Sequence, residues 1–141
     1  MLDRLKNLFL SVRYYGLLSP NLRVRRQVNQ RLGDRPALEF SDWFDQHCQP
    51  LGITQAIAHF SYTRLGHYSG IGFAHVRMGD RLAEDLHWTE VCWFDWEIQL
   101  CQDFWHAFRV DISANLHPLQ PSTLGDLLVF LNQQWLTKEA G

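Results

Sequence analysis

The sequence lacks the patterns that mark secreted, disulfide-rich and membrane-spanning proteins. Its three cysteines, Cys48, Cys92 and Cys101, are an odd number, and no two of them form a C-x-x-C pair. This spacing predicts neither a disulfide framework nor a zinc ribbon. The chain has no run of 18 apolar residues and no signal-peptide pattern at its N-terminus. We therefore expect a reduced, cytoplasmic protein.

The common catalytic and cofactor motifs are missing as well. The sequence contains no G-x-S-x-G, P-loop, dinucleotide fingerprint or H-E-x-x-H. His47, Cys48, Cys92, Cys101 and His106 are possible metal ligands. However, Cys101 and His106 fall on different faces of one predicted helix, so they would not converge on one ion. The sequence therefore predicts no enzymatic activity, no cofactor and no metal site.

Glu97 is predicted to be partly buried, because it falls between apolar residues of a helix. A carboxylate in such a place needs a partner, for example Arg77, Arg81 or Arg109, or its pKa rises. Buried carboxylates mark some active sites. No nucleophile or second acid accompanies this one, so we interpret Glu97 as half of a structural ion pair.

Charge divides the chain into two parts. Residues 1–35 hold eight lysines and arginines against two aspartates, a net charge of +6, whereas the remainder holds five against thirteen, a net charge of -8. This asymmetry predicts a basic N-terminal extension, residues 1–36, on an acidic domain, residues 37–141. The acidic domain argues against a nucleic-acid partner.

The extension has the periodicity of two amphipathic helices separated at Ser19-Pro20. The first has the apolar stripe Leu2, Leu5, Leu8, Phe9, Val12 and Tyr15, with Arg4, Lys6 and Arg13 beside it. The second has Val24, Val28 and Leu32, and Gly33 is its predicted C-cap. The extension could pack on its own acidic domain, which we favour, or it could meet anionic lipid or an acidic partner.

The middle of the chain is less regular. Ser41 is a predicted N-cap for a short helix from Asp42 to about Cys48. Residues 53–78 fit two structures, because their apolar residues match a helix in part and also alternate as in a strand, with glycines between them. We favour some β character here, a hairpin around residues 56–77.

A long aromatic helix is predicted over residues 89–108, with Thr89 as its N-cap. Its apolar arc is wider than an ordinary surface helix needs. One part of the arc is the predicted core face: Val91, Phe94, Ile98, Cys101, Trp105 and Phe108. The adjoining part is available for a partner or for the extension: Trp93, Trp96, Leu100, Phe104 and Ala107. The remaining third is expected to face water: Asp95, Gln99, Gln102, Asp103 and His106.

Residues 109–141 are predicted to form an extended piece, a loop and a final helix. Residues 109–113 are expected to be extended, and Pro118 and Pro121 predict a non-helical loop. Ser122 or Thr123 is the predicted N-cap of the last helix, and Asp126, three residues after Thr123, would complete a capping box. The buried stripe of the last helix is predicted to be Leu124, Leu127, Leu128, Leu131 and Trp135.

The order of these elements resembles the acyl carrier protein family. The resemblance is carried by WFDQHCQPLGI (43–53), DRLAEDL (80–86), FWHAFRVDIS (104–113) and STLGDLLVFL (122–131). It implies a small helical bundle whose helix II is the recognition helix. Carrier proteins attach phosphopantetheine to a serine in an Asp-Ser-Leu motif at the start of helix II. Here Trp93-Phe94-Asp95 or Thr89-Glu90-Val91 stands at that point, so the resemblance implies a carrier fold without the prosthetic group.

We therefore expect a mostly α fold, an acyl-carrier-like bundle with a helical N-terminal extension, that acts as a non-enzymatic protein-interaction or adaptor module. Helix 89–108 would bind the partner protein. The candidate partner-binding residues are Trp93, Trp96, Leu100, Phe104, Asp95, Gln99, Asp103, Arg23, Arg25 and Arg26. Two alternatives are a true carrier modified at a non-standard hydroxyl and a peripheral protein that meets an anionic membrane through residues 1–18.

Overall fold

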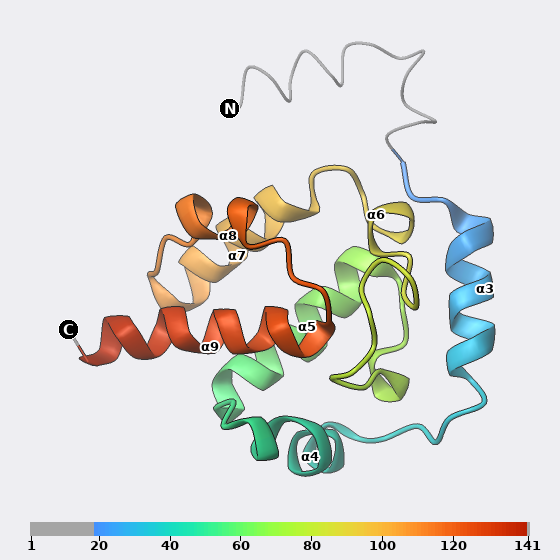
Figure 1. Cartoon of the computed structure of the whole chain (residues 1–141), viewed down its shortest axis with the longest axis horizontal. Coiled ribbons are helices and arrows are strands. Elements are labelled where there is room, and N and C mark those ends of the chain that lie inside the picture. The colour runs from blue at the N-terminus through green and yellow to red at the C-terminus, as the bar shows by residue number, and fades with distance from the viewer. Residues whose placement is uncertain (1–18, 141) are drawn as a thin grey trace.

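The computed structural model describes residues 19–140, so the helix predicted for residues 2–15 lies outside the described residues. Figure 1 shows that the described chain is helical, and no strand occurs within it. Its α-helices are α3 (Leu22–Leu32), α4 (Phe40–Trp43), α5 (Gln55–Ser69), α6 (Trp88–Val91), α7 (Trp96–Phe108), α8 (Ser113–Leu119) and α9 (Leu124–Ala140). Shorter turns are the π-helix η2 (Phe44–Cys48) and the 3-10 helices η3 (Gln49–Leu51) and η4 (Phe73–His75). The mostly α prediction is confirmed.

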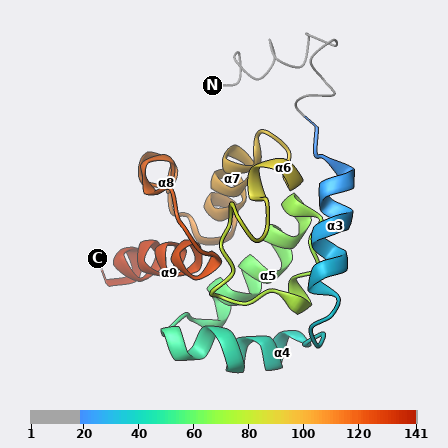
Figure 2. The same ribbon diagram turned by 45° about the vertical axis from the view of Figure 1, so that its right-hand side comes forward.

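Helix α5 is the centre of the arrangement. It contacts α7, α9, η2 and η4. In Figures 1 and 2, α3 lies on the opposite side of α5 from α9, and α4 lies across one end. Elements far apart in sequence thus share one core, with α5 as their common surface.

The hairpin predicted around residues 56–77 is wrong, because α5 occupies most of that range. Its buried residues Ile57, Ser61, Leu65 and Tyr68 recur every three or four positions, as on one face of a helix. Neighbours on several sides bury further residues, so the one-sided pattern that identifies a helix is blurred. Gly70 ends the helix at φ 68°, a conformation that suits glycine.

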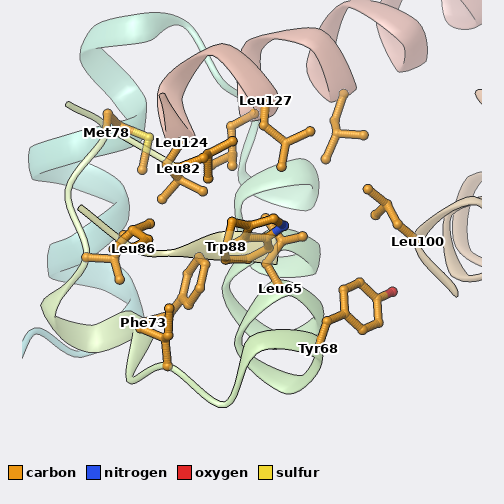
Figure 3. Packing of buried hydrophobic residues seen from close by; sticks show 14 of the residues in the cluster. Leu65, Tyr68, Phe73, Met78, Leu82, Leu86, Trp88, Leu100, Leu124 and Leu127 are labelled. Carbon is orange, nitrogen blue, oxygen red and sulfur yellow. The ribbon is translucent and has the colours of Figure 1, made fainter. Parts of the chain in front are cut away.

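The core gathers large side chains from most elements. Figure 3 shows Trp88 among Leu65 of α5, Leu124 and Leu127 of α9, and Leu82 of the segment before α6. Trp88 is 2% exposed. Trp43 is also buried, and its Nε1 donates to the carbonyl oxygen of Val76 at 2.8 Å. The Nε1–H group of Trp43 is thereby paired within the core.

Side-chain hydrogen bonds hold the starts of α5 and α9. Oδ1 of Asn132 in α9 accepts hydrogen bonds from the backbone N and Oγ1 of Thr54, at 3.0 and 2.9 Å, where α5 begins. Nδ2 of Asn132 donates to the Gly52 carbonyl at 3.2 Å. At α9 the predicted capping box is confirmed, since Thr123 N donates to Asp126 and Asp126 N donates to Thr123 Oγ1 at 3.1 Å.

Helix α3 is fastened to the domain by its polar side chains. The Arg25 guanidinium donates to the carbonyl oxygens of Val91, at 2.9 Å, and Tyr68, at 3.3 Å. Asn29 pairs with the backbone of residues 70 and 72. Val28 and Leu32 are buried beneath, as the periodicity predicted. The second half of the basic extension therefore packs on its own domain.

Arg35, just after α3, makes the most enclosed ion pair. Its NH1 and NH2 donate to the two carboxylate oxygens of Asp80 at 2.8 and 2.9 Å. Asp80 is 5% exposed, and it also accepts from the backbone N of Arg77 at 2.8 Å. The carboxylate raises the pKa of Arg35 through this hydrogen bond. Full pairing of this kind is what allows a charge to be buried.

The loop predicted between residues 113 and 121 is instead partly helical. Helix α8 includes Pro118, one residue before its last. A proline this close to the end removes only one hydrogen bond of the helix. The burial of Leu116, at 3% exposed, favours the helical turn. Asp111 accepts hydrogen bonds from Ser113 N and Oγ, at 3.0 and 2.6 Å, where α8 begins.

Candidate docking groove between α7 and α8

The predicted helix 89–108 is two helices. Thr89 lies inside α6 and caps nothing, and Cys92 is extended, with φ -85° and ψ 158°. Trp93 and Phe94 occupy the connection and are half-buried. Because Val91 and Cys92 are buried against the domain, the chain turns here before α7 begins.

Helix α7 is rotated relative to the prediction by roughly a third of a turn. Leu100 and Phe104, predicted for a partner, are fully buried, whereas Trp105, predicted for the core, is 46% exposed. The ring of Phe60 in α5 explains the choice. It packs edge-on against Phe104 and Phe108, each at 5.4 Å between centroids. Leu100 and Phe104 are therefore corrected from surface to core, and Trp105 from core to surface.

The polar residues predicted to face water are also partly turned inward. Tyr68 Oη donates to a carboxylate oxygen of Asp103. Burial, with this bond, raises the pKa of Tyr68. Gln99 is half-buried and donates to Asp95 at 2.9 Å. These three predicted partner residues thus have partners within the domain.

The remaining predicted partner residues lie apart from one another. Trp96 is half-buried and meets the ring of Trp88 edge-on at 5.8 Å. Arg23 and Arg26 are exposed on α3, far in sequence from α7, while Arg25 bonds to the carbonyls of Val91 and Tyr68. The structure does not bring these arginines together with Trp96 at one cavity. Their binding of a partner stays a prediction.

The outer face of α7 forms one wall of a groove whose other wall is α8. Three hollows follow one another along it and share lining residues. The first, about 210 Å³, lies between Trp88, Trp96 and Leu116. The next, about 210 Å³, is shared with Glu97, Ile98 and Leu116. The last, about 340 Å³, ends at Trp105. We call this set of hollows the α7–α8 groove.

Trp105 stands at the far end of the groove and is held there. The guanidinium carbon of Arg109 lies 5.8 Å from the centre of its ring, a cation–π contact. Arg109 ends α7 in the left-handed conformation, at φ 58°, and its N–H donates to the Trp105 carbonyl at 2.8 Å. The indole is thus positioned on the surface without being covered.

Two carboxylates line the hollows of the α7–α8 groove, and the guanidinium of Arg109 lies against the ring of Trp105 at its far end. Glu97 lies 3.2 Å from the Nδ1 of His117 on α8, so its partner is a histidine and not one of the predicted arginines. Asp111 is held by Ser113, whose hydrogen bonds lower the pKa of that carboxyl. No lysine or arginine lines the three hollows. The hollows are therefore mainly apolar, with two carboxylates at their edges and one guanidinium beside Trp105.

Cys101 lies in the α7–α8 groove between Ile98 and Trp105. Burial, with the nearby carboxylates of Asp111 and Glu97, raises the pKa of its thiol to about 11. At neutral pH the thiol is protonated and offers a small apolar surface. Cys48 and Cys92 are buried outside the groove. Between residues 19 and 140, no three histidine, cysteine or acidic side chains gather as a metal site.

A wider hollow of about 670 Å³ lies on the outer side of α5, over Phe40, His59, Phe60 and Phe108. The rings of its floor are already paired. Phe40 meets His59 edge-on at 5.0 Å, and Phe60 meets Phe108 at 5.4 Å. We place the candidate site in the α7–α8 groove instead, because Trp105 is the large aromatic ring that residues 19–140 leave exposed.

Comparison of the chain with protein-family models, curated proteins and solved structures gave no match. The resemblance to acyl carrier proteins therefore stays a prediction. In the part of the chain that the structure describes, no helix has the length and apolar character to cross a membrane.

Sequence reasoning placed Ile98, Cys101 and Trp105 in the core, whereas Ile98 and Cys101 are half-buried along the groove and Trp105 is exposed. Both halves of the apolar arc are equally aromatic, and Glu97 is the residue that divides them. Which half turns inward depends on the contact between Phe104 and Phe60, and Phe60 lies forty-four positions earlier in the chain. The residues near α7 in the sequence contain no pattern that predicts this contact.

Proposed function

We propose that this domain is a non-enzymatic interaction module that docks a basic amphipathic helix of a partner protein in the α7–α8 groove. The observation that carries the proposal is Trp105, 46% exposed at one end of a continuous apolar surface. Tryptophan is among the residues that contribute most to protein interfaces. The contact of the indole with Arg109 restricts its conformations before binding, which favours affinity.

The shape of the groove favours a helix as occupant. From Trp96 to Trp105, α7 extends for about 14 Å, which matches two to three turns of a second helix. Apolar side chains at i, i+3/i+4 and i+7 on that helix would meet the hollow at Trp96, the hollow at Ile98 and the ring of Trp105. The described residues offer no strand edge to which an extended peptide could add.

The charge of the groove favours a basic occupant. Glu97 is 40% exposed, and Asp111 is exposed at the other end. Lysine or arginine beside the apolar stripe of a partner would lie near both carboxylates. Opposite charges at the rim of an interface select partners and speed association more than they add affinity.

The test uses two synthetic helical peptides of about 14 residues with identical leucine positions. One carries lysine beside the leucines and the other carries glutamate. Fluorescence anisotropy with the full chain measures their dissociation constants. We expect the lysine peptide to bind more tightly, and Trp105→Ala to weaken its binding about thirtyfold, which corresponds to about 2 kcal/mol.

The matched control is Leu51→Ala. Leu51 is 47% exposed, close to the value for Trp105, and lies in η3, outside the groove. Its substitution should leave the dissociation constant unchanged. An equal loss in both variants, or equal binding of the two peptides, contradicts the proposal.

A further inference from the structure

The described chain begins beside one end of the α7–α8 groove. Asn21 N donates to the carbonyl oxygen of Glu90 at 2.8 Å, and the neighbouring Thr89 lines the first hollow. Figures 1 and 2 show the first turn of α3 next to α6. The eighteen residues that precede Ser19 are thus attached close to the hollow formed by Trp88 and Trp96.

Those eighteen residues have the chemistry that the groove selects. Their apolar stripe, Leu2, Leu5, Leu8, Phe9, Val12 and Tyr15, has helical spacing, and Arg4, Lys6 and Arg13 lie beside it. As a helix, residues 2–15 would be about 21 Å long, enough to cover the groove from Trp96 to Trp105. Residues 16–18 could span about 10 Å as a link to Ser19.

We infer that residues 2–15 occupy the α7–α8 groove of their own chain and that a partner helix must displace them. This inference rests on the proposed function, since it names the regulation of the same groove. In that arrangement the apolar stripe would cover Ile98, Cys101 and Trp105, and the basic side chains would lie near Glu97 and Asp111. The N-terminal segment is then an internal competitor that lowers the affinity for a partner.

Tethering makes such a competitor effective even when its intrinsic affinity is weak. A segment joined by a short link has an effective concentration on the order of millimolar. If it covers the groove nine-tenths of the time, the apparent affinity for a partner falls about tenfold. A partner helix with micromolar affinity would still displace it.

Two variants of the full chain test the inference. Leu8→Asp places a charge in the apolar stripe. Leu10→Asp places the same charge on the opposite side of the predicted helix, at about 100° per residue. The first measurement is the alkylation rate of each cysteine by iodoacetamide, followed by mass spectrometry. Cys101 lies in the groove, whereas Cys48 and Cys92 are buried elsewhere.

We expect Leu8→Asp to raise the alkylation rate of Cys101 about tenfold and Leu10→Asp to leave it unchanged. Unreactive Cys48 and Cys92 show that both variants keep the fold. Equal rates in the unsubstituted chain and in Leu8→Asp overturn the inference. Protection that disappears on dilution also overturns it, because the groove would then be covered by a second copy of the chain.

The lysine peptide separates this inference from the proposed function. Tighter binding to Leu8→Asp than to the unsubstituted chain, by about tenfold, supports both. Equal binding to the two chains overturns the inference and leaves the proposed function standing. Binding to neither overturns the proposed function, while protection of Cys101 in the unsubstituted chain would still support an occupied groove.

Discussion

Two edges of the domain differ in how their surfaces are completed. At the α3 edge, polar side chains reach across to the domain: Arg25 and Asn29 bond to backbone groups, and Arg35 pairs with Asp80. At the α7–α8 edge, the polar contacts between the elements are exposed and few, such as Asn115 with Gln134 and His117 with Glu97. The first edge is closed by contacts among the described residues, whereas at the second edge residues 19–140 leave apolar side chains uncovered.

The difference shows at which edge the binding of a partner can have a favourable free energy. A partner at the α3 edge would have to replace hydrogen bonds that are already made, with no net gain. A partner at the α7–α8 groove would bury the exposed part of Trp105 and the neighbouring Ile98, which is favourable at about 25 cal/mol for each Å² of apolar surface. The substitutions below test whether the two edges differ as the contacts indicate.

The largest effect is expected at the inner face of α7. Phe104→Ala removes a fully buried ring and leaves a cavity beside Phe60, so the free energy of unfolding should fall by about 4 kcal/mol. Trp105→Ala, one position along, should lower it by about 1 kcal/mol or less, because that ring is half exposed. Urea denaturation measures both. Similar losses would show that the groove face is part of the core.

An intermediate effect is expected at the α3 edge. Asp80→Ala leaves the Arg35 guanidinium without its partner in a mostly enclosed place, so we expect a loss of about 3 kcal/mol in the same measurement. Asp85→Ala is the control, because the Asp85–Arg81 pair is exposed and such pairs contribute little. If the two aspartate variants unfold at the same urea concentration, the α3 edge is not closed by its ion pair.

The smallest effect is expected at the start of α8. Hydrogen bonds from Ser113 lower the pKa of Asp111, so its contribution to stability is present above the ordinary aspartate value of about 3.9 and is lost as the pH falls through the lower folded-state pKa. An NMR titration of the carboxyl carbons should place the midpoint of Asp111 below the ordinary value. Ser113→Ala should move it upward, and Ser122→Ala should not. An unmoved midpoint in Ser113→Ala would contradict this account of the α8 edge.

The sequence predicted the elements whose signals are local. The stripe of Val28 and Leu32 in α3, the Thr123–Asp126 capping box and the buried leucines of α9 depend on neighbours within a few positions, and all are confirmed. Helix α5 was missed because it is surrounded. Its apolar residues occupy several sides, and the alternation of Ala58, Phe60 and Tyr62 imitates a strand.

The sequence predicted that the aromatic helix has surplus apolar surface, but not which of its residues form the groove. An apolar arc too wide for one face indicated that part of the aromatic helix would be left over, and Trp105 is that part. Which part remained outside was decided by tertiary contacts, from Phe60 to Phe104 and from Tyr68 to Asp103. Helix α8 was also needed for the second wall, and its proline made it resemble a loop.

Asn132 has a consequence for how the protein is made. The residue that precedes the central helix α5, its N-cap Thr54, is held by a side chain about eighty positions later, in the last helix of the described chain. A nascent chain that has not yet exposed α9 to solvent lacks these hydrogen bonds and the leucines that cover α5. Completion of the core around α5 therefore has to wait until α9 has been synthesised, and until then the apolar sides of the central helix lack part of their cover.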